Sequence, residues 1–323
     1  MNGDGGHPQA GLVVGGDGHL YGTTAHGGTN GWGTIFTLNH DGSGFSLLRL
    51  IPGTNSNEIE PLAGLLEGSD GALYGTTWGL GGIGTIFALA HDGGAFTNLY
   101  RFNAAAGVRA RLIEGTNGAL FGTASIGTAP SFGTVFKLNK DGSGFSTLRT
   151  FGSASDGRNP AAGLVQGASG LLYGTTLNGS TNSSTTGTNW GTVFKIATDG
   201  TAYKILRSFD SPAGDAYPAA SLIPASDGAL YGTASSGGTM TAGTLFALGL
   251  PPVFTGLDFG AAGALLHLSG ISGRNYAIQS TTNLFHASWQ LLPGLAGGTN
   301  GLFQFLASGA TNSPATFYRA LAQ

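Results

Sequence analysis

The stretch Gly170-Leu171-Leu172-Tyr173-Gly174-Thr175-Thr176 decides the fold, because close versions of it occur four more times in the chain. The other copies are Leu20-Tyr21-Gly22-Thr23, Leu73-Tyr74-Gly75-Thr76, Leu120-Phe121-Gly122-Thr123 and Leu230-Tyr231-Gly232-Thr233. The leucines at positions 20, 73, 120, 172 and 230 are 53, 47, 52 and 58 residues apart. Spacings of this size are typical of propeller blades and exceed those of most solenoid coils. Repetition therefore determines the architecture.

Each repeat consists of four short segments, which we name a, b, c and d in chain order. Segment a contains a leucine, as in Gly11-Leu12-Val13-Val14, and the glycine of a turn follows that leucine after six residues in all five copies. This turn reads Asp-Gly, Asn-Gly or Ser-Gly, and such pairs between β-rich runs indicate a hairpin. Segment b is the stretch quoted above. Segment c begins Gly-Thr-apolar-Phe, and in the first four copies a second Asp-Gly turn precedes segment d. We therefore expect two tight hairpins in each repeat.

Five repeats of four strands predict an all-β protein in which residues 1–250 form a five-bladed β-propeller. The repeats span approximately 8–53, 54–104, 105–152, 153–210 and 211–250. A β-solenoid is the alternative, and it would need shorter coils without paired Asp-Gly hairpins.

The fifth repeat differs from the others because it stops after segment c, at Leu245-Phe246-Ala247-Leu248. It therefore has three strands, or its edge is covered by the C-terminal segment or by another subunit. After Pro251-Pro252 the composition changes, and alternating apolar and polar residues predict a small β-sandwich-like domain over residues 253–323.

Length variation is confined to two places in the repeat. The gap from the aromatic residue of segment b to the glycine of segment c is 12, 10, 12, 18 and 12 residues, and the connection from segment d to the next segment a also varies. In a four-stranded blade these bc loops and da crossovers lie on one face, and the uniform turns lie on the other. Variable loops on a rigid scaffold are where binding residues concentrate, so we expect any site on the bc/da face.

Composition excludes several classes of protein and site. With 13 Lys and Arg and a net charge of -3, the chain has no basic stripe, and we expect no nucleic-acid partner. Cysteine is absent, which excludes disulfides, thiolate metal sites and a cysteine nucleophile. No apolar run reaches the roughly 18 to 20 residues of a membrane span. The first six residues lack the features of a signal peptide.

The four linked motifs resemble the Gloeobacter and Verrucomicrobia ("GloVer") tandem repeat of exported bacterial proteins. The resemblance covers residues 8 to about 248 and rests on Gly-Leu, Asp-Gly-x-Leu-Tyr-Gly-Thr-Thr, Gly-Thr-x-Phe-x-Leu and Asp-Gly-Ser-Gly-Phe, which recur in this order. The tail, with Tyr276-Ala277-Ile278-Gln279, is similar to the C-terminal β-domain common in secreted verrucomicrobial proteins. This resemblance implies a secreted or cell-surface protein and brings no characterised catalytic activity.

Aromatic residues of the bc/da face are the candidate ligand-binding residues. Trp32, Phe132 and Trp190 directly precede the glycine of segment c, and Trp78 directly follows segment b. A flat ring on a rigid loop can stack on a sugar while neighbouring amides bind its hydroxyl groups. The neighbouring amides are Asn30, Asn178 and Asn189. The alternative is that these rings pack between blades and close the loops.

Few acidic groups remain for catalysis, because seven of the 16 Asp and Glu residues lie in hairpin turns. Glu67 and Glu114 share one repeat position, and a carboxylate pair about 5 to 10 Å apart can serve glycoside hydrolysis. We expect them instead to be solvated residues at strand ends. The histidines lack zinc-ligand spacing, and His40 and His91 precede Asp-Gly turns, where we expect them on the surface. We expect no metal and no cofactor.

The sequence therefore favours a non-catalytic extracellular or cell-surface scaffold for adhesion or self-assembly, with self-association through the edge strand of the fifth repeat. Glycans or other surface proteins are the expected partners. A carbohydrate-binding propeller that uses the bc/da face is the alternative, and a glycan-processing enzyme is a remote one.

Overall fold

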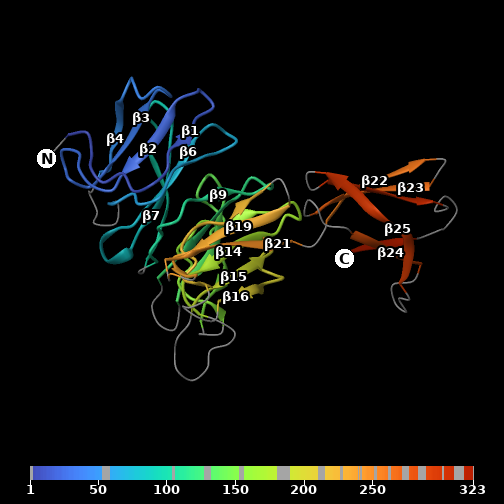
Figure 1. Cartoon of the computed structure of the whole chain (residues 1–323). Coiled ribbons are helices and arrows are strands. Elements are labelled where there is room, and N and C mark those ends of the chain that lie inside the picture. Colours follow the sequence, from blue (N-terminus) through green and yellow to red (C-terminus); the bar gives the residue numbers. More distant parts are fainter. Residues whose placement is uncertain are drawn as a thin grey trace. The chain divides into compact units, whose positions relative to one another are not determined.

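The computed structural model describes residues 3–52, 59–103, 106–126, 132–152, 156–179, 190–209, 215–225, 228–238, 240, 242–250, 253–260, 263–270, 276–282, 289–299, 302–308 and 316–322. The chain divides into two compact units, residues 1–222 with 233–244, and residues 223–232 with 245–323. Almost all regular structure is β, and the short 3-10 turn η1 (Leu80–Gly82) is the one helical element of the described residues (Figure 1). No helix in the described part of the chain has the length and apolar character needed to cross a membrane.

Each of the first four repeats forms one four-stranded antiparallel sheet whose strands follow chain order. Repeat 1 has β1 (Val13–Val14), β2 (Leu20–Thr24), β3 (Thr34–Leu38) and β4 (Ser46–Leu50). Repeat 2 has β5 (Leu66–Glu67), β6 (Leu73–Thr77), β7 (Thr85–Leu89) and β8 (Thr97–Arg101). Repeat 3 has β9 (Ile113–Glu114), β10 (Leu120–Ala124), β11 (Thr134–Leu138) and β12 (Ser146–Thr150). Repeat 4 has β13 (Val165–Gln166), β14 (Leu172–Thr176), β15 (Thr192–Ile196) and β16 (Lys204–Ser208). The all-β class and the four-stranded repeats are confirmed.

The fifth repeat forms a three-stranded sheet. Its strands are β18 (Ile223–Pro224), β19 (Ala229–Ala234) and β21 (Thr244–Gly249), in the order β18-β19-β21. A separate pair, β17 (Asp215–Ala216) with β20 (Ser236–Gly237), ties the preceding crossover to the segment after β19. The sequence left open whether this sheet has three strands or an edge that is covered by another segment. In the described residues the sheet has three strands, and β21 lies at its edge.

The a–b hairpins form because their turn glycines adopt a conformation that other residues avoid. Gly18 and Gly71 have φ values of 83° and 76°, in the left-handed region. The preceding aspartate fixes the hairpin further: the hydroxyl of Tyr21 donates to Asp17 Oδ2 at 2.6 Å, and that of Tyr74 donates to Asp70 Oδ2 at 2.7 Å. The tyrosine of the repeated stretch therefore stabilises the turn that precedes it.

The glycine of the repeated Tyr-Gly-Thr makes room for a ring from the next strand. A Cβ atom on Gly75 would lie 2.3 Å from Cζ of Phe87, which faces it across the sheet. The pairing of segments c and d shifts register at this phenylalanine in each of the first four repeats, as between Ile86 and Phe87, where Leu99 of β8 is the extra residue. The shift is a β-bulge that locally bends the strand of segment d. The glycine, the bulge and the phenylalanine ring therefore occur together in the same part of each sheet.

Successive sheets pack face to face through apolar residues. We call the face that a sheet turns to the following repeat its back face, and the face that it turns to the preceding repeat its front face. In the first interface the back face of repeat 1 contributes Val13, Tyr21, Ile35 and Ile51, and the front face of repeat 2 contributes Leu65, Leu73, Phe87 and Leu89. Residues at the same repeat positions form the cores between repeats 2 and 3 and between repeats 3 and 4. One packing solution is therefore used three times.

Threonine hydroxyls also join neighbouring repeats. The hydroxyl of Thr123 donates to the carbonyl of Ala162 at 2.9 Å, and that of Thr23 donates to Ala63 at 3.2 Å. Both acceptors lie just before segment a of the following repeat. The next threonine bonds within its own sheet, as Thr24 does to Thr34 at 2.8 Å. The two threonines of the repeated stretch thus satisfy buried polar groups both between and within sheets.

The C-terminal residues form a separate six-stranded antiparallel arrangement in the order β22-β23-β26-β25-β24-β27. Its strands are β22 (Val253–Gly260), β23 (Gly263–Ser269), β24 (Tyr276–Thr281), β25 (Gln290–Thr299), β26 (Leu302–Ser308) and β27 (Phe317–Ala322). Strand β25 pairs with β24 along its first part and with β26 along its last part. Alternate residues of β23, β24 and β26 form the core around the buried Tyr276 and Phe303.

Candidate functional site

The aromatic positions of the bc/da face lie at the junctions between repeats. Among the described residues, each crossover into a repeat includes a residue with a φ value between 55° and 62°, in the left-handed region: His7, Glu60, Gly107, Asn159 and Tyr217. Its carbonyl accepts a hydrogen bond from the residue that follows segment b, as Glu60 does from the N–H of Trp78 at 2.9 Å. The N–H groups of Glu60, Gly107, Asn159 and Tyr217 donate to the preceding repeat, and for three of them the acceptors are the carbonyls of Trp32, Phe132 and Trp190 at 3.1, 2.8 and 2.7 Å. These aromatic residues are therefore fixed by the backbone that joins two repeats.

Three of the four rings also contact a side chain from the following crossover. The guanidinium of Arg109 lies 3.8 Å from the ring centroid of Trp78, and that of Arg158 lies 4.0 Å from that of Phe132. These distances are typical of cation–π contacts. The ring of Trp190 packs edge to face on Tyr217, with centroids 5.3 Å apart. The contacts agree with the alternative in which the aromatic residues close the junctions.

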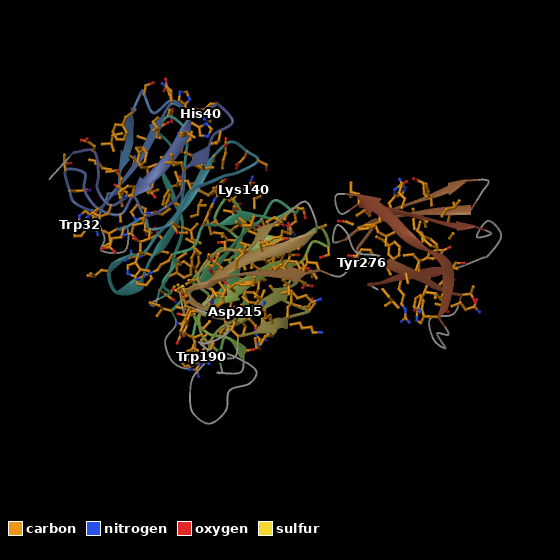
Figure 2. The ribbon with its side chains drawn as sticks, viewed as in Figure 1. Trp32, His40, Lys140, Trp190, Asp215 and Tyr276 are labelled. Atoms are coloured by element: carbon orange, nitrogen blue, oxygen red, sulfur yellow. The ribbon has the colours of Figure 1, made fainter. Side chains whose placement is uncertain are left out.

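Trp32 differs from the other three, because this residue is 42% exposed whereas Trp78, Phe132 and Trp190 are half-buried. Figure 2 marks Trp32 and Trp190 in their separate repeats. Among the described residues no ring contact joins any of the four aromatic residues to another. Each belongs to a different junction, so they do not converge into one platform.

The predicted amide ligands have partners within the loops. Asn30 donates from Nδ2 to the carbonyl of Ile51 at 2.5 Å, and its Oδ1 accepts from the N–H of Trp32 at 3.3 Å. Asn178 donates from Nδ2 to Oδ1 of Asn159 at 3.1 Å. Asn189 lies outside the described residues. The two described amides thus hold loop backbone and crossover side chains in place.

Glu67 is a turn-binding residue, which corrects the expectation of a solvated strand end. Both of its carboxylate oxygens accept from the N–H of Gly16 in the preceding repeat, each at 2.8 Å. His91 lies between two acids, with Nε2 3.2 Å from Glu67 Oε1 and Nδ1 3.5 Å from Asp17 Oδ2. Its ring also stacks on Tyr21 at 4.8 Å. Glu67 and His91 therefore belong to the contact between repeats 1 and 2.

Glu114 has the same role one repeat later, with a lysine in place of the histidine. It accepts from the N–H and the hydroxyl of Ser69, both at 2.7 Å, and Lys140 Nζ lies 2.7 Å from its Oε1. Lys140 also lies 3.3 Å from Oδ1 of Asp70. Burial alone would raise the pKa of Glu114, but the hydrogen bonds from Lys140 and Ser69 outweigh it and hold the pKa below its usual value. The two glutamates thus serve different interfaces: Glu67 binds a turn of repeat 1, and Glu114 binds a turn of repeat 2.

The polar clusters were missed from the sequence, although a signal was present. Glu67, Glu114 and Gln166 occupy one repeat position, and Gln166 accepts from the N–H of Thr116 at 2.8 Å in the same way. His91 and Lys140 also share a position, which precedes the second Asp-Gly turn. Comparing these two positions across repeats would have indicated a recurring polar contact between sheets. Figure 2 labels Lys140.

The stability of the protein is expected to fall on acidification, and Lys140→Met reduces that fall. In the folded protein the pKa values of Glu114 and Asp70 are lowered from unfolded values of about 4.3 and 3.9. The two carboxylates therefore stabilise the folded state fully above those unfolded values. This stabilisation is lost as the pH falls through the folded pKa values. The folded pKa of Lys140 is raised, so its contribution is present below about pH 10.4 and lost as the pH rises through the folded pKa. At pH 7 the variant should lose about 1 to 2 kcal/mol.

Urea denaturation at pH 7 and pH 3 measures this effect. Lys140→Met should show a smaller difference between the two pH values than the wild type, because the pKa values of its acidic partners return toward their unfolded values. Lys204→Met, at an exposed position of β16, should keep the wild-type difference. Equal pH dependence in the wild type and Lys140→Met would contradict the assignment.

Other acidic groups are also engaged in structural contacts. Arg149 forms an ion pair with Asp156, and Arg207 forms one with Asp215 at the equivalent position of the next repeat. Within the residues that the structure describes, no group of three or more His, Asp and Glu side chains is arranged to hold a metal ion.

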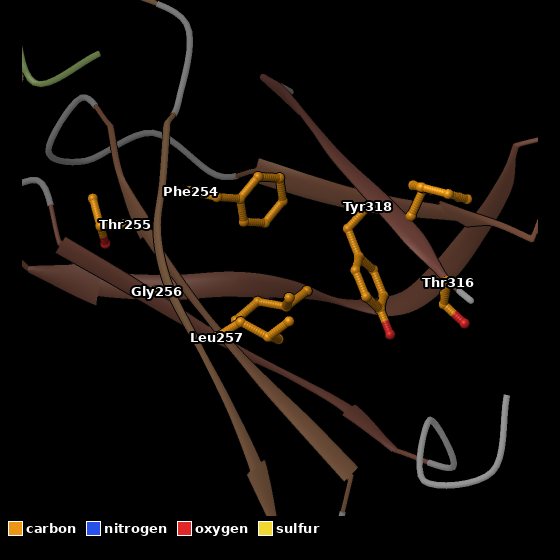
Figure 3. Close-up of a pocket in the computed structure, with 8 residues that line it drawn as sticks. Phe254, Thr255, Gly256, Leu257, Thr316 and Tyr318 are labelled. Atoms are coloured by element: carbon orange, nitrogen blue, oxygen red, sulfur yellow. The ribbon is translucent and has the colours of Figure 1, made fainter. Parts of the chain in front are cut away.

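The C-terminal strands border an apolar pocket of about 490 Å³ (Figure 3). Phe254 and Leu257 of β22, Leu266 of β23, and Phe317 and Tyr318 of β27 line it. Burial raises the pKa of Tyr318 above its usual value. None of the residues predicted from the sequence to bind a ligand lies in this pocket.

Comparisons with known proteins give one family match. The model of the Gloeobacter/Verrucomicrobia repeat matches residues 1–188, and the resemblance expected from the sequence is thereby confirmed. A search of curated proteins gives no match. Among solved structures, the chain is similar to an exo-β-1,3-galactanase from Phanerochaete chrysosporium crystallised with β-1,3-galactotriose, at 10% identity and a TM-score of 0.43 over 98% of this chain and 90% of that one. At this TM-score the likeness establishes neither a shared fold nor a shared activity.

Proposed function

The chain belongs to the Gloeobacter/Verrucomicrobia repeat family, and from this premise we propose that it is a non-catalytic scaffold of the cell exterior, secreted or displayed at the surface, that acts in adhesion or self-assembly. The finer architecture that we propose is a β-propeller-type array in which the five repeat sheets are the blades. Support comes from the face-to-face packing of successive sheets, which uses the same residue positions in three interfaces.

One observation supports a structural role above the others: the side chains best suited to chemistry or binding hold repeats together. Glu67 and Glu114 bind turns of the preceding repeat. The rings of Trp78 and Phe132 lie under arginines of the following crossover. A carboxylate that is held by a backbone N–H and a neighbouring cation is poorly placed to attack a substrate or to transfer a proton to it.

Carbohydrate binding is the second candidate, and the exposed ring of Trp32 favours it. An indole that presents a free face can stack on the apolar side of a sugar ring. Trp32 is also held rigidly, because its carbonyl accepts from Glu60 and its N–H donates to Asn30. A single preformed aromatic position of this kind would give weak binding, which repeated display on a surface would strengthen.

Binding and hydrolysis measurements on a glycan panel test both candidates. For a scaffold we expect no specific retention of glycans and no release of reducing sugar. Retention that disappears in Trp32→Ala but persists in Trp78→Ala, whose ring is covered by Arg109, would establish the second candidate. Sugar release that is lost in both Glu67→Gln and Glu114→Gln would contradict a non-catalytic role. Antibody labelling of intact cells tests the proposed location, and exclusively internal labelling would contradict it.

A further inference from the structure

The apolar pocket of the C-terminal strands lies where two strand edges face the same space. Strands β22 and β27 stand at the two ends of the strand order, and in the described part of the chain each pairs with one strand, β23 and β24 respectively. Residues of both edges nevertheless line the pocket of about 490 Å³ (Figure 3). Because no described strand joins the two edges, the apolar interior stays accessible between them.

The lining of the pocket is continuous with the core of these strands. Leu266 is 2% exposed and belongs to the core cluster, and Phe254 and Tyr318 pack against that cluster. Figure 3 shows the rings of Phe254 and Tyr318 reaching toward the pocket from different strands. Leu257 also lines the pocket but is 44% exposed, which places it at the opening. The pocket is thus apolar from floor to opening, and its volume lies within the range of about 300 to 1,000 Å³ that is typical of small-molecule sites.

The charges around the pocket select a neutral ligand. None of the described lining residues carries a charge. The charged residue of β22 is Asp258, an acid directly after Leu257. The cation of β27 is Arg319, which is engaged elsewhere: its Nε donates to Gln279 Oε1 at 2.7 Å, and its guanidinium lies 4.4 Å from the ring centroid of Trp289. An anion in the pocket would therefore lack a counter-charge, which makes its transfer from water costly.

Hydroxyl groups are the polar side-chain groups of the pocket. Thr255, Thr316 and Tyr318 supply them, and none of the three forms a side-chain hydrogen bond with another described residue. A phenol hydroxyl can donate to a carbonyl oxygen of a ligand. An apolar pocket with a few hydrogen-bonding groups is the usual composition of a small-molecule site.

We propose that this pocket binds the acyl chain of a neutral ester, whose carbonyl oxygen accepts a hydrogen bond from the Tyr318 hydroxyl. The chain fills the apolar space, and the ester provides an acceptor without bringing a charge. The ester belongs either to a free molecule or to a lipid, since both present the same chemistry to the pocket. The proposal goes beyond the scaffold function and does not depend on it.

Competition against a neutral apolar dye, N-phenyl-1-naphthylamine, tests the site in the intact chain. The fluorescence of the dye should rise when it enters the pocket. Methyl decanoate should displace the dye at least about tenfold more effectively than decanoate, because the carboxylate of decanoate has no counter-charge there. Leu257→Asp places a carboxylate at the opening and should weaken the binding of both dye and ester at least about tenfold.

Tyr318→Phe separates the hydrogen bond from the apolar contact. This variant keeps the ring, so the dye, which has no carbonyl group, should bind with wild-type affinity, whereas methyl decanoate should bind about three- to tenfold more weakly. Leu291→Asp is the matched control, because it places the same charge at an exposed leucine of β25 outside the pocket, and it should bind both ligands like the wild type. Circular dichroism establishes that each variant is folded, and Phe317→Asp replaces Leu257→Asp if the latter fails to fold.

Three results would overturn the proposal: no binding of the dye, equal displacement by methyl decanoate and decanoate, or wild-type affinity in the folded Leu257→Asp variant. Cosedimentation with phosphatidylcholine vesicles identifies the source of the ester. Retention on vesicles that Leu257→Asp loses would indicate a lipid, and ester binding without retention would indicate a free molecule. None of these measurements involves glycans, so this proposal and the proposed function fail separately.

Discussion

Replacing Phe87 by alanine is expected to lower the free energy of unfolding by about 3 to 5 kcal/mol, among the largest effects of any single substitution in the chain. Phe87 is fully buried between the back face of repeat 1 and the front face of repeat 2, where it also stacks on Phe96 at 5.2 Å. Its ring fills the space that Gly75 leaves open. Alanine would therefore create a cavity that the two packed sheets cannot easily close.

Phe36→Ala is the matched control, because Phe36 holds the same repeat position on the front face of repeat 1. Its side chain is half-buried, so truncation removes less packing and leaves a site open to water. We expect a loss well below half of that for Phe87→Ala in chemical denaturation. Similar losses for the two variants would mean that packing between repeats does not stabilise the array in the way we describe.

Replacing Gly133 by alanine is expected to destabilise the protein by about 2 to 5 kcal/mol, for two independent reasons. Gly133 has a φ of 112°, which an alanine adopts only with strain. A Cβ atom would also lie 2.5 Å from the carbonyl oxygen of Ala124 and 2.6 Å from Cδ of Pro160, which belongs to the crossover into repeat 4. The neighbours are backbone and a proline ring, so they have little freedom to move.

Gly11→Ala serves as the control for this prediction. A Cβ atom at Gly11 meets nothing within 4 Å, and its backbone is not among those with positive φ. Thermal or urea unfolding should place this variant within about 0.5 kcal/mol of the wild type. If Gly133→Ala unfolded like Gly11→Ala, the close approach of the crossover to segment c would not be required for the fold.

Both predictions follow from the packing of each sheet on its neighbours in the sequence. Each sheet contacts its sequence neighbours through the same positions, so a defect at one interface acts on two repeats and leaves the distant ones packed. Losses in different interfaces should therefore add.

The family, the all-β class, the strands and their hairpins could be predicted from the sequence, because the interactions behind them are local. The Asp-Gly turns, the tyrosine four residues after each turn aspartate, and the glycine opposite the phenylalanine of segment c all lie within single repeats. Their regular spacing also placed the bc loops and crossovers together on one face. Fivefold recurrence made each of these signals stronger than one copy would be.

Only the tertiary structure decided what the polar and aromatic residues of the junctions do. Glu67 meets Gly16 from 51 residues away, and Glu114 meets Ser69 from 45 residues away. Arg109 covers Trp78 from the following crossover. These partners are set by how one sheet stacks on the next, and the local sequence of a repeat does not contain that information. A carboxylate at a strand end therefore has the same local sequence signal whether it is solvated, catalytic or bound to the turn of a neighbouring repeat.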